Sequence, residues 1–289
     1  MILIKEYYRL AKPGIVYGNL ITASAGFFLA SKGNINFQLL VATLIGIALI
    51  IGSSCVFNNY IDRGIDEKMP RTKNRALVKG TVSPRNALIY ATVLGILGFL
   101  VLAIYTNFIT VIIGSIGVFF YIVMYSIWKR RSIYGTIVGS VSGAVPIVAG
   151  YTAVTNHFDM GAFLIFMILV LWQMPHFYAI AIYRLKDYTA AKIPVLPVKK
   201  GIFITKIHML SYIIAFIIAV SLLTILGFTG YIYLSVALAL GGSWLLLCIK
   251  GFKTNNDAIW ARKMFFFSLI TITLLSVVIS IDALVKNVI

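Results

Sequence analysis

Nine charge-poor apolar stretches constrain this chain more than any other feature of its sequence. A helix needs roughly 20 apolar residues to cross the hydrocarbon core of a bilayer, and stretches of that length recur along the whole chain. We therefore predict an all-α polytopic membrane protein, with nine transmembrane helices around a central cavity in a single integral-membrane domain over residues 1–289. The helices are expected near residues 15–31, 37–57, 87–106, 108–128, 134–154, 160–183, 207–227, 231–249 and 265–285.

Two joints between spans and the start of the chain leave alternatives. At Thr106-Asn107 and at Thr229-Gly230, one long tilted helix could replace two spans. Such a helix of about 40 residues would be about 60 Å long, about twice the hydrocarbon thickness, which favours two spans in each case. The first stretch also resembles a signal peptide, but it continues past the cleavage-like Ala23-Ser24-Ala25, so we predict a retained helix.

The basic residues test the number of spans and predict their orientation. The chain has 25 Lys and Arg and a formal net charge of +17, which in a soluble protein would suggest a nucleic-acid partner. With nine spans and a cytoplasmic N-terminus, however, only Lys32 and Lys286 fall on the opposite side, as the positive-inside rule requires. The basic loops then face an anionic leaflet, so we predict the lipid bilayer as partner, no nucleic acid, and a C-terminus outside.

A polar segment at the end of the second predicted span carries the strongest functional signal. Asn58, Asp62 and Asp66 follow one another at intervals of four residues, so they line one stripe of a helix. Their oxygen atoms suit a hard cation such as Mg²⁺. The basic residues that follow would repel one another unless an anion lay among them: Lys68, Arg71, Lys73 and Arg75. The pattern predicts a site for Mg²⁺ and a diphosphate. The alternative is a solvated loop, which gives no reason for the regular interval.

A second polar segment ends the sixth predicted span. Tyr183 and Asp187 repeat the interval of four, and Lys186 adds a basic group between them. His176 precedes Asp187 by eleven residues, so a straight helix would place both side chains on one face, about 16 Å apart along its axis. Pro175 could kink this helix and change that distance.

His176 and Trp172 each have a structural alternative. A lone histidine in an apolar helix is more often a hydrogen-bonded packing residue than a ligand, and Trp172 fits either a membrane-interface belt or a pocket. The basic loops after the second and sixth spans close with the similar segments 77–80 and 196–201. This internal similarity suggests two related halves that face each other across the cavity.

These segments together resemble the UbiA-type intramembrane prenyltransferases. Asn58, Asp62 and Asp66 match the first aspartate-rich motif of that family, and residues 69–75, 172–177 and 183–188 are similar to the branch that farnesylates protohaem IX. Tyr183 stands where the wider family often has an aspartate. The resemblance then implies either a metal held by fewer carboxylates or a role for Tyr183 towards the haem.

The resemblance implies transfer of a farnesyl group from farnesyl diphosphate to the vinyl group of haem B, giving haem O and diphosphate for haem-copper oxidase assembly. The implied Mg²⁺ ligands are Asn58, Asp62, Asp66 and Asp187. The implied catalytic residues are Asp62, Asp66, Asp187 and Tyr183. The implied substrate-binding residues are Arg71, Arg75, Lys186, Lys73, His176 and Trp172. The expected location is the bacterial cytoplasmic (inner) membrane, with an active site open to the cytoplasm and with haem-handling or oxidase-assembly proteins as partners.

Two other functions remain as alternatives to farnesyl transfer to haem. One is a UbiA-type enzyme that prenylates an aromatic quinone precursor. The segments around Trp172–His176 and Tyr183–Asp187 favour haem over such an acceptor. The other is a polytopic haem transporter. Transporters usually keep an ionisable residue at mid-membrane depth, and no Asp, Glu, Lys or Arg lies near the middle of a predicted span.

Overall fold

The computed structural model describes residues 2–285, and nine helices in that range are long and apolar enough to cross a membrane. This confirms the predicted all-helical class and the predicted number of spans. The spans are α2 (Pro13–Ser31), α3 (Phe37–Asp66), α5 (Pro84–Tyr105), α6 (Phe108–Phe119) continued by η1 (Phe120–Tyr125) and α7 (Ser126–Arg131), α8 (Gly135–Thr155), α9 (Met160–Tyr183), α11 (Leu196–Ile225), α12 (Tyr231–Lys250) continued by η2 (Gly251–Lys253), and α13 (Asp257–Val285). Lys286, which entered the charge argument, lies outside the described residues.

Both uncertain joints separate two helices. Asn107 ends the first joint and caps α6, because its side-chain oxygen accepts a hydrogen bond from the backbone N–H of Thr110. At the second joint the chain reverses through Gly227, whose φ of 80° lies in the left-handed region that glycine adopts without strain. Gly230 then precedes α12 as its N-cap residue.

Three helices extend well beyond their predicted bounds at the end where the polar motifs lie. The span predicted to end near residue 57 continues to Asp66, so the whole stripe from Asn58 is helical. α11 begins at Leu196, with Pro197 in its first turn, and bends at Gly201. α13 begins at Asp257. Hydropathy stops at the membrane surface, whereas helical hydrogen bonding continues past it, and this explains the short predictions.

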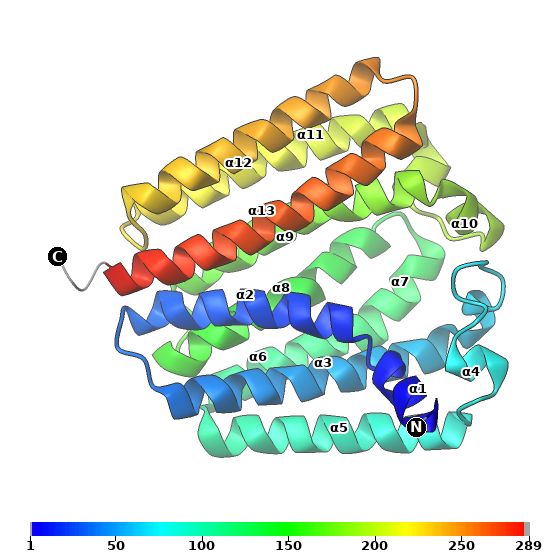
Figure 1. The fold of residues 1–289 in the computed structure, drawn as a ribbon, viewed down its shortest axis with the longest axis horizontal. Helices are drawn as coiled ribbons and strands as arrows, with labels where there is room; N and C mark the ends of the chain where they lie inside the picture. The colour runs from blue at the N-terminus through cyan, green and yellow to red at the C-terminus, as the bar shows by residue number, and fades with distance from the viewer. Residues whose placement is uncertain (1, 286–289) are drawn as a thin grey trace.

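Three short helices lie at one end of the bundle: α1 (Ile2–Leu10), α4 (Ala76–Lys79) and α10 (Leu185–Ala190). Figure 1 shows them at the same end as the N-terminus, whereas α13 finishes at the opposite end. α3 packs along α5, and α9 packs along both α11 and α13. The two polar motifs, at the ends of α3 and α9, therefore open onto one end of the molecule.

The helices α2 and α8 approach closely enough for backbone to meet backbone. A Cβ atom at Gly26 of α2 would overlap the carbonyl oxygen of Ile147, and one at Gly150 of α8 would overlap the carbonyl oxygen of Ala23. Small residues of this kind allow close helix packing where lipid supplies no hydrophobic drive between helices. This contact holds the first span against the fifth.

We expect Gly150→Ala to destabilise the protein in detergent micelles. The added methyl group must push α2 and α8 apart, and overpacking of this kind costs about 1–3 kcal/mol. Gly242→Ala in α12 is the matched control, because a Cβ atom there meets nothing within 4 Å. The measurement is the thermal unfolding midpoint of each variant. Equal midpoints for Gly150→Ala and the wild type would contradict the close α2–α8 contact.

Candidate functional site

A single cavity of about 970 Å³ receives side chains from both polar motifs. Asn58, Asp62 and Asp66 line it from α3, and Tyr183 and Asp187 line it from the end of α9 and from α10. Most of the remaining wall is apolar. A volume of this size fits a drug-sized or larger organic ligand. The expectation that the motifs meet at one cavity therefore agrees with the structure.

The stripe on α3 is buried as well as aligned. Asn58, Asp62 and Asp66 are 4%, 9% and 5% exposed, and unbroken helix connects them. Carboxylates are almost never this buried unless they are paired. Their partners are therefore part of the site.

Basic residues from three segments pair with the α3 stripe. Lys129 of α7 forms an ion pair with Asp62, and the Arg130 guanidinium lies 3.2 Å from the other Asp62 oxygen. Arg75 donates to Asp66 across 2.5 Å. Each carboxylate is thereby neutralised by a cation that a diphosphate could also attract.

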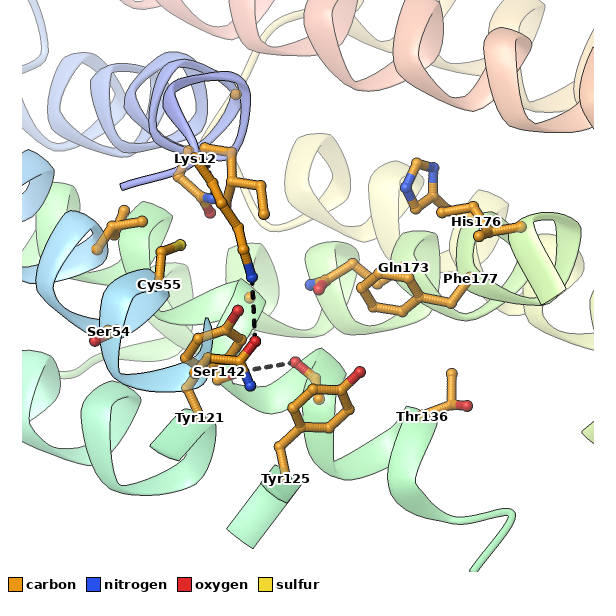
Figure 2. A pocket seen from close by; sticks show the side chains of 18 of the residues that line it. Lys12, Ser54, Cys55, Tyr121, Tyr125, Thr136, Ser142, Gln173, His176 and Phe177 are labelled. Atoms are coloured by element: carbon orange, nitrogen blue, oxygen red, sulfur yellow. Dashed lines mark hydrogen bonds between the residues drawn. The ribbon is translucent and has the colours of Figure 1, made fainter. Parts of the chain in front are cut away.

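Lys12 completes this basic set from the start of α2. Its side chain reaches into the pocket, and its Nζ donates to the Asn58 side-chain oxygen across 3.1 Å (Figure 2). Its backbone φ of 52° is left-handed, a strained value for a non-glycine residue, and Pro13 follows it at the first turn of the helix. Burial lowers the pKa of Lys12 to about 8.

The sequence reasoning gave no role to Lys12, Lys129 or Arg130. Lys12 counted only as one of several basic residues in the tail, although its place directly before Pro13 and the first span is a usable signal. Lys129 and Arg130 counted towards the orientation and, within the segment 129–132, towards the family resemblance, but not as site residues. Their pairing with Asp62 joins residues 67 and 68 positions apart, which no local pattern reveals.

The second motif differs from the straight helix that was expected. α9 passes through Pro175 and ends at Tyr183, where Arg184 takes a non-helical conformation, and Asp187 lies on the separate α10. The projection of His176 and Asp187 onto one helix face is therefore wrong. Both side chains still line the same cavity, because the bend returns α10 to its mouth.

Two predicted substrate-binding residues are not brought to the cavity. Arg71 and Arg75 line it, but Lys73 and Lys186 are exposed and are not among its lining residues. The turn after α3 is anchored by the buried Thr72, which donates to the Asp66 carbonyl across 2.8 Å. Lys186 precedes Asp187 on α10, and consecutive helical residues point about 100° apart.

The deep part of the cavity is formed by α9 and α13. Trp172 and His176 line it, are each 8% exposed, and stack with ring centroids 4.8 Å apart. The Trp172 indole donates to the Ser268 carbonyl across 2.9 Å. The side-chain amide of Gln173 donates hydrogen bonds to the Ser140 and Leu169 carbonyls. These bonds hold the Gln173 side chain in place at this wall of the cavity.

The donors of the α3 stripe suit a divalent cation by chemistry. They offer carboxylate and carboxamide oxygens, which are ligand atoms for such a cation. The buried Nδ2 of Asn58, a donor without a hydrogen-bond partner in the described chain, suits an anion instead. Within residues 2–285, no three His, Cys, Asp or Glu side chains gather closely enough to hold a metal by themselves. Asn58, Asp62, Asp66 and Asp187 share the cavity, and their joint role as metal ligands stays a prediction.

Comparison with known proteins identifies the family of this chain. The model of the UbiA prenyltransferase family matches residues 19–270. Protoheme IX farnesyltransferase of Serratia proteamaculans (strain 568) is 55% identical over 97% of this chain and 95% of the relative. The protein of the same name from Yersinia pseudotuberculosis serotype O:1b (strain IP 31758) is 54% identical over the same shares.

Solved structures share the fold at low identity. A digeranylgeranylglyceryl phosphate synthase superimposes with a TM-score of 0.80 at 18% identity, covering 98% of this chain and 99% of that one. A UbiA homologue from Archaeoglobus fulgidus, bound to GPP and Mg²⁺, superimposes with a TM-score of 0.72 at 16% identity, covering 95% of this chain and 99% of that one. With the family model matching most of its length, this chain belongs to the UbiA prenyltransferase family.

Proposed function

We propose that this protein transfers the farnesyl group of farnesyl diphosphate to a vinyl group of haem B, which yields haem O and diphosphate. The observation that carries this proposal is the division of one cavity into two parts. Its mouth holds buried carboxylates and cations, and its depth is lined by apolar and aromatic side chains. This matches a substrate with a charged diphosphate and a long apolar chain, and the high identity to proteins named protoheme IX farnesyltransferase supports haem as the acceptor.

Diphosphate binds at the mouth of the cavity. Asn58, Asp62, Asp66 and Asp187 would hold Mg²⁺, which would supply positive charge to neutralise the diphosphate as a leaving group. Charge-assisted hydrogen bonds to the diphosphate oxygens come from basic residues around the stripe: Lys12, Arg71, Arg75 and Lys129. Each of these four side chains lines the cavity. The exposed Lys73 and Lys186 contribute at most to the surrounding positive field.

The reaction balances as a substitution followed by hydration. The bond between the farnesyl C1 and oxygen breaks, and its electron pair leaves with diphosphate. The vinyl electrons of haem then form the new carbon–carbon bond to C1. Water adds to the neighbouring carbon and loses a proton, which leaves the hydroxyl group. The apolar wall keeps other water away from the allylic cation until the bond has formed.

Tyr183 and Trp172 contact the haem in this proposal. The Tyr183 ring lies 5.8 Å from that of Phe265, and the Phe265 ring lies 5.0 Å from the His176 imidazole. These rings connect the mouth of the cavity to its depth along α9 and α13. A flat aromatic acceptor can pack against them by stacking and edge contacts.

The protein is integral to a membrane, since nine apolar helices in the described range can span one. We place it in the bacterial cytoplasmic membrane with the mouth of the cavity and the N-terminus facing the cytoplasm, because the basic loops gather at that end. Haem-handling or oxidase-assembly proteins are the partners that this location would offer.

The test is a product assay. Membranes that contain the protein receive haem B, farnesyl diphosphate and Mg²⁺, and the pigment is analysed by mass spectrometry. We expect a haem that carries one farnesyl group and one hydroxyl group. A product from 4-hydroxybenzoate but none from haem would assign the protein to quinone-precursor prenylation. Movement of haem across proteoliposomes without any product would assign it to transport.

A further inference from the structure

The steps of farnesyl transfer described above assign no task to the buried histidine of the cavity, His176. His176 is 8% exposed and lines the cavity. Its ring is held between Trp172, at a centroid distance of 4.8 Å, and Phe265, at 5.0 Å. In Figure 2 it lies on the opposite side of the pocket from Lys12.

The contacts of Ser268 favour one arrangement of protons on the His176 ring. The Ser268 hydroxyl donates its only hydrogen to the Phe265 carbonyl across 2.6 Å. The His176 Nδ1 lies 2.7 Å from the same hydroxyl oxygen, which can then only accept. With the Ser268 hydrogen on the Phe265 carbonyl, Nδ1 is the donor of a neutral imidazole and Nε2 carries a free lone pair.

The Nε2 lone pair has no partner among the described residues, although the ring around it is fixed by stacking and by Ser268. Histidines that bind metals usually have this arrangement, because a hydrogen bond from the other ring nitrogen orients the ring and raises its basicity. Neutral imidazole is also the commonest proximal ligand of haem iron. A structural role alone would explain the hydrogen bond between His176 and Ser268. It would not explain why Nε2 lies at the cavity wall without a hydrogen-bond partner in the described chain.

We propose that Nε2 of His176 is an axial ligand to the iron of the haem substrate. The inference rests on the proposed function, which supplies haem as the acceptor. Coordination would orient the porphyrin plane relative to the iron–nitrogen bond. It would also determine how far the edge of the porphyrin lies from the mouth of the cavity. Tyr183 lies seven residues further along α9, about 10 Å away. His176 thus positions the haem so that a vinyl group meets the farnesyl C1 near Tyr183.

Other side chains of the cavity are weaker candidates for this ligand. The thiol of Cys55 also lines the cavity, but it would have to lose its proton before binding iron. Lys12 donates to Asn58 and lies among the diphosphate-binding residues. His157 and His208, the other two of the three histidines, are exposed and do not line the cavity.

The test uses the purified full chain in detergent micelles, titrated with haem B and followed by visible absorption. We expect a histidine-ligated spectrum in the wild type that His176→Ala loses, with haem affinity lower by about tenfold or more. His157→Ala and His208→Ala are the matched controls and should keep both the spectrum and the affinity. Added imidazole should restore the ligated spectrum to His176→Ala. A purely structural role of His176 does not predict this rescue.

A second probe separates iron ligation from packing. Metal-free protoporphyrin IX has no iron to bind, so its affinity should be equal for the wild type and His176→Ala. The iron–histidine stretch in the resonance Raman spectrum of the wild-type ferrous complex, shifted by ¹⁵N-histidine labelling, tests the bond without any variant. Absence of that band, or a spectrum lost on Cys55→Ser instead, would overturn the proposal.

Failure of this inference can be told apart from failure of the proposed function. If haem is farnesylated while the wild-type complex lacks a histidine-ligated iron, the reaction stands and His176 has only a packing role. If the ligated spectrum is present but no farnesylated haem forms, His176 binds haem in a protein with another activity.

Discussion

Replacing Asp62 by Asn is expected to lower kcat/KM for farnesyl diphosphate by about 100-fold to 1000-fold, equivalent to about 3–4 kcal/mol. Asp62 lies at the centre of the α3 stripe and is paired with both Lys129 and Arg130. The substitution removes the charge that holds the metal while keeping the size of the side chain. The measurement is steady-state formation of farnesylated haem at fixed haem B and Mg²⁺.

Glu67→Gln is the matched control for this loss. Glu67 is the next acidic residue after the stripe, but it is exposed and does not line the cavity, so its variant should keep wild-type turnover. A global effect of negative charge at the end of α3 would lower the activity of both variants. Full turnover in Asp62→Asn would contradict its role at the metal.

Loss of an ion-pair partner must be separated from loss of a metal ligand. The Lys129 side chain is only 11% exposed, so Asp62→Asn leaves a poorly solvated cation without its partner and should also reduce stability. The double variant Asp62→Asn/Lys129→Gln removes that unpaired charge. We expect it to recover the unfolding midpoint but not the turnover. Recovery of both would show that Asp62 serves only to balance Lys129.

Removal of divalent metal is expected to reduce turnover to background. Excess EDTA should stop product formation, and Mg²⁺ added beyond the chelator should restore it. The carboxylates of Asp62 and Asp66 already pair with Lys129, Arg130 and Arg75, and without a divalent cation they would repel the diphosphate. The haem absorption spectrum should not change under EDTA, since the porphyrin retains its iron. Continued turnover in EDTA would mean that Lys12, Arg71, Arg75 and Lys129 suffice to hold the leaving group.

The two predicted regions differ in how well the sequence located them, and the reason is helical continuity. Asn58 to Asp66 lie on one unbroken helix, so the interval of four residues directly gives a buried stripe. From His176 to Asp187 the same arithmetic fails, because the helix ends at Tyr183 and the chain turns at Arg184. No Gly or Pro marks that turn in residues 181–190, so the residue types there do not predict it.

The basic residues that pair with the α3 stripe also show how far the local sequence can locate contacts. Arg75 follows Asp66 by nine residues, and the sequence already grouped the two. Lys129 and Lys12 reach the stripe from α7 and from the start of α2, and only the packing of distant helices brings them there. Conversely, Lys73 and Lys186 looked equivalent to their neighbours in sequence, yet the direction of each side chain takes them into solvent.

By itself the sequence determined the nine spans and the stripe on α3, because both follow from periodicities that one helix contains. It also determined the family, through segments that match position by position. The tertiary structure alone decided which cations pair with Asp62, how α10 returns Asp187 to the cavity, and which side chains contact the His176 ring. Each of these depends on atoms from segments far apart in the chain, whose relative position is set by helix packing and not by local pattern.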